Sequence, residues 1–276
     1  MVIKENKILK VIKYGILIIF VLCALVPIMY IISSSFMGQG EVKKALLNNH
    51  LHIIPDNFTL IQYYEVFLRK PVFLLKFWNS IILTVPAILG QIVISILGAY
   101  AFGKIKFPFS KQIFFMFILL MIMPYQVTLV PIYIILKKMN LVGTYVSVIL
   151  PSAFSTFGVF LLTQFIKSIP NEQCESAKVD GANHRQILFK IILPQCTGAI
   201  ASLAILSFVD NWNMIEQPLI FLPAEKQPIS TFLSQINQSE LGLAFAVGVL
   251  FMIPSIFIYL KGEKSLLEGI QHLDSK

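Results

Sequence analysis

Histidine and acidic side chains carry much of the metal-binding and proton-transfer chemistry of proteins, and this 276-residue chain offers few of them in suitable positions. Its four histidines fall in segments predicted to be loops: His50, His52, His184 and His272. The chain lacks the HExxH and GxSxG patterns of zinc and serine hydrolases. Asp210 is the one acidic residue well inside an apolar run, whereas a proton-coupled carrier normally needs more than one. We therefore expect no catalytic residues, no metal site and no cofactor.

One motif suggests nucleotide binding but does not satisfy its requirements. Residues 98–104 read GAYAFGK and match GxxxxGK, the start of a phosphate-binding loop. Ile105 stands where that loop needs a Ser or Thr hydroxyl to hold magnesium. The motif also ends a long apolar run instead of joining a strand to a helix, so we predict that it does not bind ATP.

The composition is that of a membrane protein. Hydrophobic residues make up 57% of the chain and charged residues 13%, about half the charged share of a soluble domain. This excludes a soluble enzyme and a disordered protein. Three cysteines without paired spacing exclude a disulfide scaffold. The net charge of +8 comes mainly from scattered lysines, so we expect membrane lipid and no nucleic acid as a partner.

Six stretches are long and apolar enough to cross a bilayer core of about 30 Å, which takes roughly 20 helical residues. They are 14–33, 78–102, 113–136, 145–165, 191–212 and 241–260. The first contains an apolar run of 18 residues, longer than the roughly 7–15 of a secretory signal, so we expect an uncleaved helix. The sequence therefore predicts an all-α integral membrane protein, a bundle of about six transmembrane helices.

Lysine and arginine predict which way these helices face, because they are enriched in cytoplasmic loops. With the N-terminus inside, cytoplasmic segments carry 14 of these side chains and outer segments carry 8. Both termini are thus predicted to be cytoplasmic. The expected segments are a cytoplasmic N-terminus (1–13), a first helix (14–33), an extracytoplasmic segment (34–77), a five-helix core (78–260) and a cytoplasmic tail (261–276).

The cytoplasmic loop 167–190 has the most informative local pattern. Pro170 and Asn171 favour the start of a short helix that continues towards Gly181. Gly181 permits the left-handed conformation that ends a helix, and a second helix then leads to Pro194. The pattern predicts two short helices joined by a sharp bend at the membrane surface. Composition alone leaves an ordinary amphipathic loop equally open.

The spacing in this loop resembles the signature of membrane-spanning permease subunits of bacterial ABC importers, specifically the maltose-transporter-like carbohydrate uptake family. That signature reads EAA, three residues, G, nine residues and I-x-L-P. The matching residues are Glu175, Ser176, Ala177, Gly181, Ile191, Leu193 and Pro194. Every interval is kept, and Ser176 replaces one small residue by another. Further segments similar to the family extend from Trp78-Asn79-Ser80 to Pro218-Leu219-Ile220.

The resemblance implies a multi-pass permease of the bacterial cell membrane that is not itself an enzyme. It implies four kinds of partner: a second permease subunit, cytoplasmic ATP-binding subunits, an extracellular sugar-binding protein and lipid. It also implies that the loop residues around Glu175, Ser176, Ala177, Asp180 and Gly181, with Ile191, Leu193 and Pro194, couple the chain to the ATPase. The chain would then form half of the path for a sugar or oligosaccharide.

An alternative from another class is a secondary transporter or a channel that works without an ATPase. The scarcity of buried ionisable residues and the cytoplasmic signature argue against it. Polar or aromatic side chains inside predicted spans or near their ends are candidates to line the substrate pathway: Asn79, Gln126, Asn211, Trp212 and Asn213, together with Gln91 and Glu216. For each polar residue, hydrogen bonding between helices within the bundle is the competing interpretation.

Overall fold

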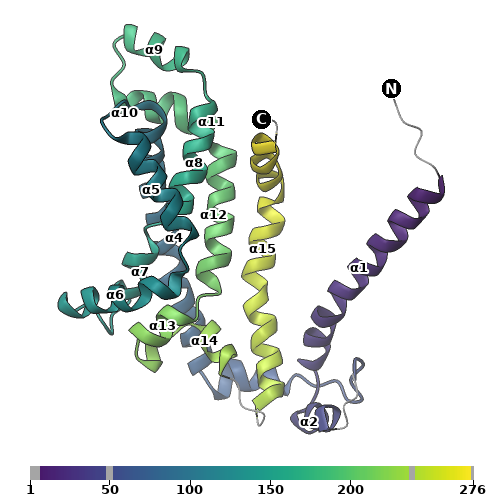
Figure 1. Cartoon of the computed structure of the whole chain (residues 1–276). Helices are drawn as coiled ribbons and strands as arrows, with labels where there is room; N and C mark the ends of the chain where they lie inside the picture. The colour runs from purple at the N-terminus through teal and green to yellow at the C-terminus, as the bar shows by residue number, and fades with distance from the viewer. Residues whose placement is uncertain (1–6, 48–51, 236–239, 275–276) are drawn as a thin grey trace. The chain divides into compact units, whose positions relative to one another are not determined.

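The structure, a computed structural model, describes residues 7–47, 52–235 and 240–274, and these residues form helices and turns without a β-strand (Figure 1). The chain divides into two compact units, Met1–Leu74 with Gln235–Met252 and Leu75–Ser234 with Ile253–Lys276. The long helices α4 (Val72–Lys104) and α15 (Leu241–Asp274) each contribute residues to both units. The all-α membrane fold predicted from composition is confirmed.

The first unit contains the N-terminal helix and several short elements. These are α1 (Lys7–Ser34), α2 (Gln39–Leu47), α3 (Ile61–Tyr64), a π-helical segment (Glu65–Arg69) and the start of α15. None of the most apolar window of α1 is buried inside the chain, as expected for a helix whose side chains meet lipid or a partner helix. Near the C-terminal end of α1, Tyr30 packs edge-on against Phe245 of α15, with ring centroids 5.6 Å apart.

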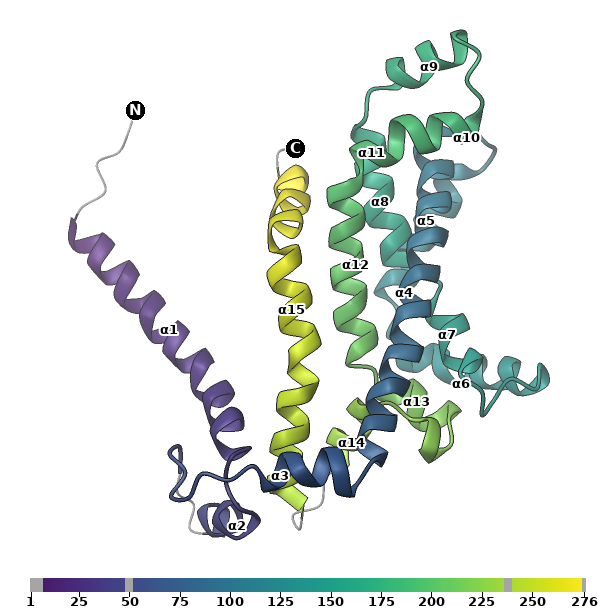
Figure 2. The ribbon, with the colours of Figure 1, turned by 180° about the vertical axis from the view of Figure 1, so that it is seen from behind.

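The second unit contains most of the remaining helices. In chain order they are α4 (Val72–Lys104), α5 (Ser110–Ile122), α6 (Tyr125–Lys138), α7 (Val146–Ser152), α8 (Thr156–Ser168), α9 (Asn171–Val179), α10 (His184–Ile187), a π-helical segment (Leu188–Ile192), α11 (Leu193–Gln195), α12 (Thr197–Trp212), α13 (Glu216–Phe221), a 3₁₀ turn (Ala224–Lys226) and α14 (Ile229–Ser234). Figure 2 shows α9, α10 and α11 at one end of α4, α8 and α12, with α6, α7 and α13 at the other end.

Within the described residues, four helical stretches are long and apolar enough to cross a membrane, and two bent pairs raise the number to six if each counts as one span. The four stretches are Ile12–Ser34, Val72–Lys104, Val146–Ser168 and Leu241–Glu263. The expected span 113–136 is bent by 104° between α5 and α6, and the expected span 191–212 belongs to a pair bent by 76° before α12. About six apolar stretches are therefore found, but two of them are not straight helices.

The sharper bend lies where Pro124 follows Met123. Met123 is extended, with φ −71° and ψ 126°, because a residue before proline is disfavoured in the helical region. Proline also lacks the N–H that would continue the hydrogen-bond ladder of α5. Pro86 and Pro254, by contrast, lie inside continuous helices. Proline alone therefore does not determine where a span breaks.

A core of the second unit forms where α8 meets α4 and α12. Leu162, Ile166 and Leu203 are at most 1% exposed there. Glycine allows the close approach, since a Cβ on Gly103 of α4 would lie 2.7 Å from the side chain of Ile166 on α8. Likewise, a Cβ on Gly98 would lie 3.2 Å from Val159. The two glycines of the GxxxxGK motif thus serve helix packing.

Candidate functional site

The short helix α9 lies at one end of the second unit and exposes most of its surface (Figures 1 and 2). Glu172 lies in its first turn and Lys178 in its last, which suits the helix dipole at both ends. Cys174 is the buried residue of this helix, and Ala177 packs partly against the core. Glu175 and Ser176 are exposed. The helix therefore rests on small side chains and presents its other face outward.

The turn after α9 has the conformation predicted for Gly181, whose φ is +84°. The Gly181 N–H donates to the Lys178 carbonyl at 3.0 Å, and the Ala182 N–H donates to the Ala177 carbonyl at 2.9 Å. This is the Schellman arrangement, which uses carbonyls that a helix end leaves unpaired. No heavy atom lies within 4 Å of a Cβ placed on Gly181, so the backbone conformation alone favours glycine. Asp180 is the C-cap residue of α9 and is exposed.

The next helix starts with a capping box at Asn183. The Asn183 side chain accepts from the Gln186 N–H at 2.9 Å, and the Gln186 side chain accepts from the Asn183 N–H at 2.8 Å. These bonds set the direction of α10 directly after the bend. The expectation of two short helices joined at Gly181 is therefore confirmed as a local structure.

The I-x-L-P part of the signature joins this second helix to the core. Ile192 is fully buried, while Ile191 and Leu193 pack partly buried against the same cluster. Pro194 is exposed and starts α11 near its first position, where a missing N–H costs little. The motif residues thus lie in three places: on the exposed helix α9, at the bend that follows it, and in the segment that packs against the core.

Lys104, the last residue of α4, connects that helix to the leading end of α9. Its ammonium group donates to the carbonyl of Ile169 and, at 2.8 Å, to the side-chain oxygen of Asn171. These partners are 65 and 67 residues away in sequence. The lysine of the apparent phosphate loop therefore has a structural partner, and sequence reasoning missed this contact because no local pattern encodes it.

A second contact joins α4 to the trailing end of the loop. The Tyr100 hydroxyl lies 3.0 Å from Nδ1 of His184, and Tyr100 is only 6% exposed. Tyr100 and Lys104 are one helical turn apart, so one face of α4 contacts both the start of α9 and the start of α10. On α11, the Gln195 side-chain amide donates to the Gln173 side-chain oxygen at 2.9 Å. The loop 167–190 is thus bound to α4 and α11 by side chains.

A cavity of about 420 Å³ lies beside α9. It is lined by Gly103, Lys104, Ile105, Lys106, Asn171, Cys174, Glu175, Lys178 and His184. Three of these side chains are lysines and one is a carboxylate, so the lining is predominantly basic. At the end of α9, Val179 is 88% exposed, an apolar side chain without cover. A partner with an acidic and apolar surface would complement this region.

Most of the candidate pathway residues are buried. Asn79 is 3% exposed, donates to the carbonyls of Glu225 and Gln227, and accepts from the Tyr145 hydroxyl at 2.8 Å. Asn211 is buried and donates to the Ser207 carbonyl, and Trp212 is buried with its ring stacked on Phe208. Gln91 is buried as well, and its amide donates to the Ser152 carbonyl at 2.6 Å. Asn79 and Gln91 therefore bond to other segments of the chain, whereas the Asn211 side chain bonds within α12 itself.

Gln126, Asn213 and Glu216, the remaining candidates, are exposed. The Gln126 amide donates to both oxygens of Glu216 on α13, at 3.0 and 3.2 Å. The Asn213 side-chain amide donates to the Val209 carbonyl at 2.8 Å. The structure therefore brings a carboxylate and an amide together on an exposed part of the second unit, although they are 90 residues apart in sequence.

Comparisons with known proteins match most of the chain. The family model for the binding-protein-dependent transport system inner membrane component matches residues 74–260. The polygalacturonan/rhamnogalacturonan transport system permease protein YtcP of Bacillus subtilis is 28% identical over 96% of this chain and 97% of its own. The osmoprotective compounds uptake permease protein GgtD of Synechocystis is 32% identical over 70% of this chain and 67% of its own.

A solved structure shares the fold. It is described as the crystal structure of a bacterial ABC transporter involved in the import of the acidic polysaccharide alginate. The TM-score is 0.82 with 24% sequence identity, and the match covers 96% of this chain and 98% of that chain. The arrangement of helices is therefore one that an importer subunit uses.

Proposed function

We propose, because this chain belongs to the family of binding-protein-dependent transport system inner membrane components, that it forms half of the translocation pathway of an ATP-driven carbohydrate importer. Membership makes the chain a multi-pass permease subunit of an ABC importer and not an enzyme. The proposed partners are a second permease subunit, cytoplasmic ATP-binding subunits and an extracellular sugar-binding protein, with lipid around the apolar helices.

Carbohydrate is the proposed cargo because two relatives that align with nearly the whole chain are named for the transport of polysaccharides or oligosaccharides. Besides the Bacillus protein, the arabinooligosaccharides transport system permease protein AraQ of Halalkalibacterium halodurans is 26% identical over 90% of this chain. The exposed polar groups of Gln126, Asn213 and Glu216 have the chemistry to bind sugar hydroxyls. Uptake of labelled oligosaccharides by the reconstituted importer, with an amino acid as the negative control, tests the class of cargo.

We further propose that α9 transmits the conformational state of the ATPase to the membrane helices. The pathway has two conformational states, and the ATPase closed on ATP binds one of them more tightly than the other. ATP binding therefore shifts the equilibrium towards that state. Movement of α9 reaches α4 through Lys104 and through the Tyr100–His184 contact, and it reaches α11 through Gln195. Rigid helices then carry the displacement through the membrane.

The observation that carries this proposal is an exposed helix with an uncovered apolar side chain at its end, bonded on its inner side to α4 and α11. We expect Val179→Asp to release the ATPase, because the substitution puts a charge into an apolar contact. Met139→Asp is the matched control: Met139 is also exposed and apolar, but it follows α6 at the other end of the unit.

The readouts are co-purification of the ATPase with the tagged permease and ATP hydrolysis stimulated by the binding protein. Retention of the ATPase by Val179→Asp, with normal stimulation, would contradict the role of α9. A secondary transporter or channel predicts a different result, since uptake would then continue without any ATP-binding subunit.

We propose the topology with both termini in the cytoplasm, supported by the distribution of Lys and Arg. Residues 1–13 and 261–276 would lie inside, 34–77 outside, and the coupling loop 167–190 inside. Cysteine labelling in intact cells tests this arrangement. A cysteine in place of Lys226 should react with a membrane-impermeant reagent, whereas one in place of Arg185 should be shielded, and the reverse pattern would refute the topology.

A further inference from the structure

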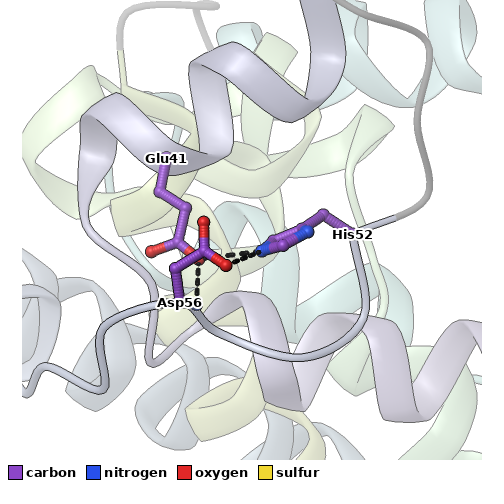
Figure 3. A group of neighbouring side chains, drawn as sticks. All are labelled: Glu41, His52 and Asp56. Atoms are coloured by element: carbon purple, nitrogen blue, oxygen red, sulfur yellow. Dashed lines mark hydrogen bonds and ion pairs between the residues drawn. The ribbon is translucent and has the colours of Figure 1, made fainter.

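Three potential metal ligands meet in the first unit (Figure 3). Glu41 lies in the first turn of α2, and His52 and Asp56 lie in the segment that precedes α3. Nε2 of His52 is 3.1 Å from Oε1 of Glu41 and 3.4 Å from Oδ1 of Asp56. One donor atom from each residue lies within 4.8 Å of the other two.

We propose that Glu41, His52 and Asp56 form a zinc site in the predicted extracytoplasmic segment. Zinc binds imidazole nitrogen and carboxylate oxygen at about 2.0–2.2 Å in tetrahedral geometry, which places neighbouring donors about 3.3–3.6 Å apart. The distances from His52 to the two carboxylates are close to this spacing, so small side-chain shifts would complete the site. Calcium suits the site less well, because it takes six to eight oxygen ligands.

The charges of the three groups favour a cation between them. Two carboxylates contribute two negative charges, and an imidazole contributes at most one positive charge, so the cluster stays negative even with His52 protonated. A divalent ion removes this excess and binds the imidazole nitrogen directly. Lys44 lines the same cavity, but it is exposed, and its long side chain can direct the ammonium group into solvent.

The surroundings both orient a ligand and leave room for another. The Asp56 N–H donates to Oε1 of Glu41 at 2.7 Å, which holds that carboxylate towards the cluster. The cavity at the cluster is also lined by Asn57, so an amide oxygen or a water can supply a fourth ligand. Glu41 is the least exposed of the three side chains at 16%, and His52 is next at 34%. A bound ion would fasten the segment at His52–Asp56 to α2.

Zinc binding is tested on the purified full chain with its partner subunits, stripped of metal with a chelator and titrated with zinc chloride in a calorimeter. We expect one saturable site per chain that His52→Ala and Glu41→Gln each weaken at least tenfold. Glu65→Gln is the matched control, since Glu65 belongs to the same unit but is not one of the three proposed ligands. Its Oε1 pairs instead with the Arg69 guanidinium, at 2.8 Å. That variant should bind zinc as the unmodified chain does.

Cobalt(II) absorption of the unmodified chain gives a second measurement that does not depend on folding of the variants. Intense visible bands typical of tetrahedral cobalt, removed by one equivalent of zinc, would support the site. Three results would overturn the proposal: no saturable zinc binding, equal affinity for zinc in His52→Ala, or an octahedral cobalt spectrum. Each would leave the cluster as an ion pair between His52 and its two carboxylates.

Discussion

Gly181 joins α9 to α10 with a φ of +84°, and replacing it tests whether the shape of this turn is needed for coupling. A left-handed conformation costs an L-residue roughly 1–2 kcal/mol. A Cβ at this position would meet no heavy atom within 4 Å, so the cost comes from the backbone alone. A cost of about 1–2 kcal/mol lowers the equilibrium population of the turn about 5- to 30-fold.

The series Gly181→Asn, Gly181→Ala and Gly181→Val separates conformation from size. Asparagine adopts the left-handed region most readily of the three, alanine less so, and β-branched valine least. We therefore expect sugar uptake and stimulated ATP hydrolysis to fall in that order, with transport abolished and the ATPase loosened in Gly181→Val. The assay uses proteoliposomes containing the complete importer and its binding protein.

Gly143 provides a matched control within the same unit. Its φ is +86°, and a Cβ there would also meet no heavy atom within 4 Å, but it lies between α6 and α7. Gly143→Ala should therefore carry a similar backbone cost without reducing stimulated ATP hydrolysis. Equal losses in both alanine variants would mean that general destabilisation is responsible. Wild-type uptake by Gly181→Val would mean that the bend is only a connector.

Lys104→Met removes the hydrogen bonds between α4 and the start of α9, which contribute about 1–2 kcal/mol for a charged donor near the surface. We expect several-fold lower uptake per ATP hydrolysed, with partial recovery in Lys104→Arg. An unchanged ratio of uptake to ATP hydrolysis would mean that α4 takes no part in coupling. Asn213→Ala should lower uptake while the subunits still assemble, because Asn213 is exposed, and unchanged uptake at limiting sugar would remove it from the pathway. Asn211→Ala should instead lower the yield of assembled complex in size-exclusion chromatography, because Asn211 is buried and bonded within α12, and normal yield would show that this packing is dispensable.

Sequence reasoning succeeds where the information is local or additive. Apolar runs identify helices in the membrane because the transfer of each side chain into lipid contributes largely independently of the fold. The bend after α9 is equally accessible, since Gly181 and the residues around it form their hydrogen bonds within five positions of one another. Local patterns alone therefore suffice to place the signature residues from Glu175 to Pro194 on a short helix, a turn and a second helix.

Tertiary structure decides which helices break and which distant side chains meet. Hydropathy does not distinguish the broken span at Pro124 from the continuous helices that contain Pro86 and Pro254, because it ignores backbone conformation and neighbouring helices. The local pattern places Lys104 in an incomplete phosphate loop, yet its partners lie 65 and 67 residues away.

The candidate pathway residues show the same limit. Asn79 is buried among backbone carbonyls about 146 residues further along, whereas Gln126 is exposed beside Glu216. Both are amide side chains in or beside apolar segments, so their types and local spacing are equivalent. Their environments differ because burial and hydrogen-bond partners depend on the packing of whole helices, which a local pattern does not contain. Local sequence patterns are thus enough to predict the apolar helices and the turn at Gly181, whereas the surroundings of each polar side chain depend on tertiary packing.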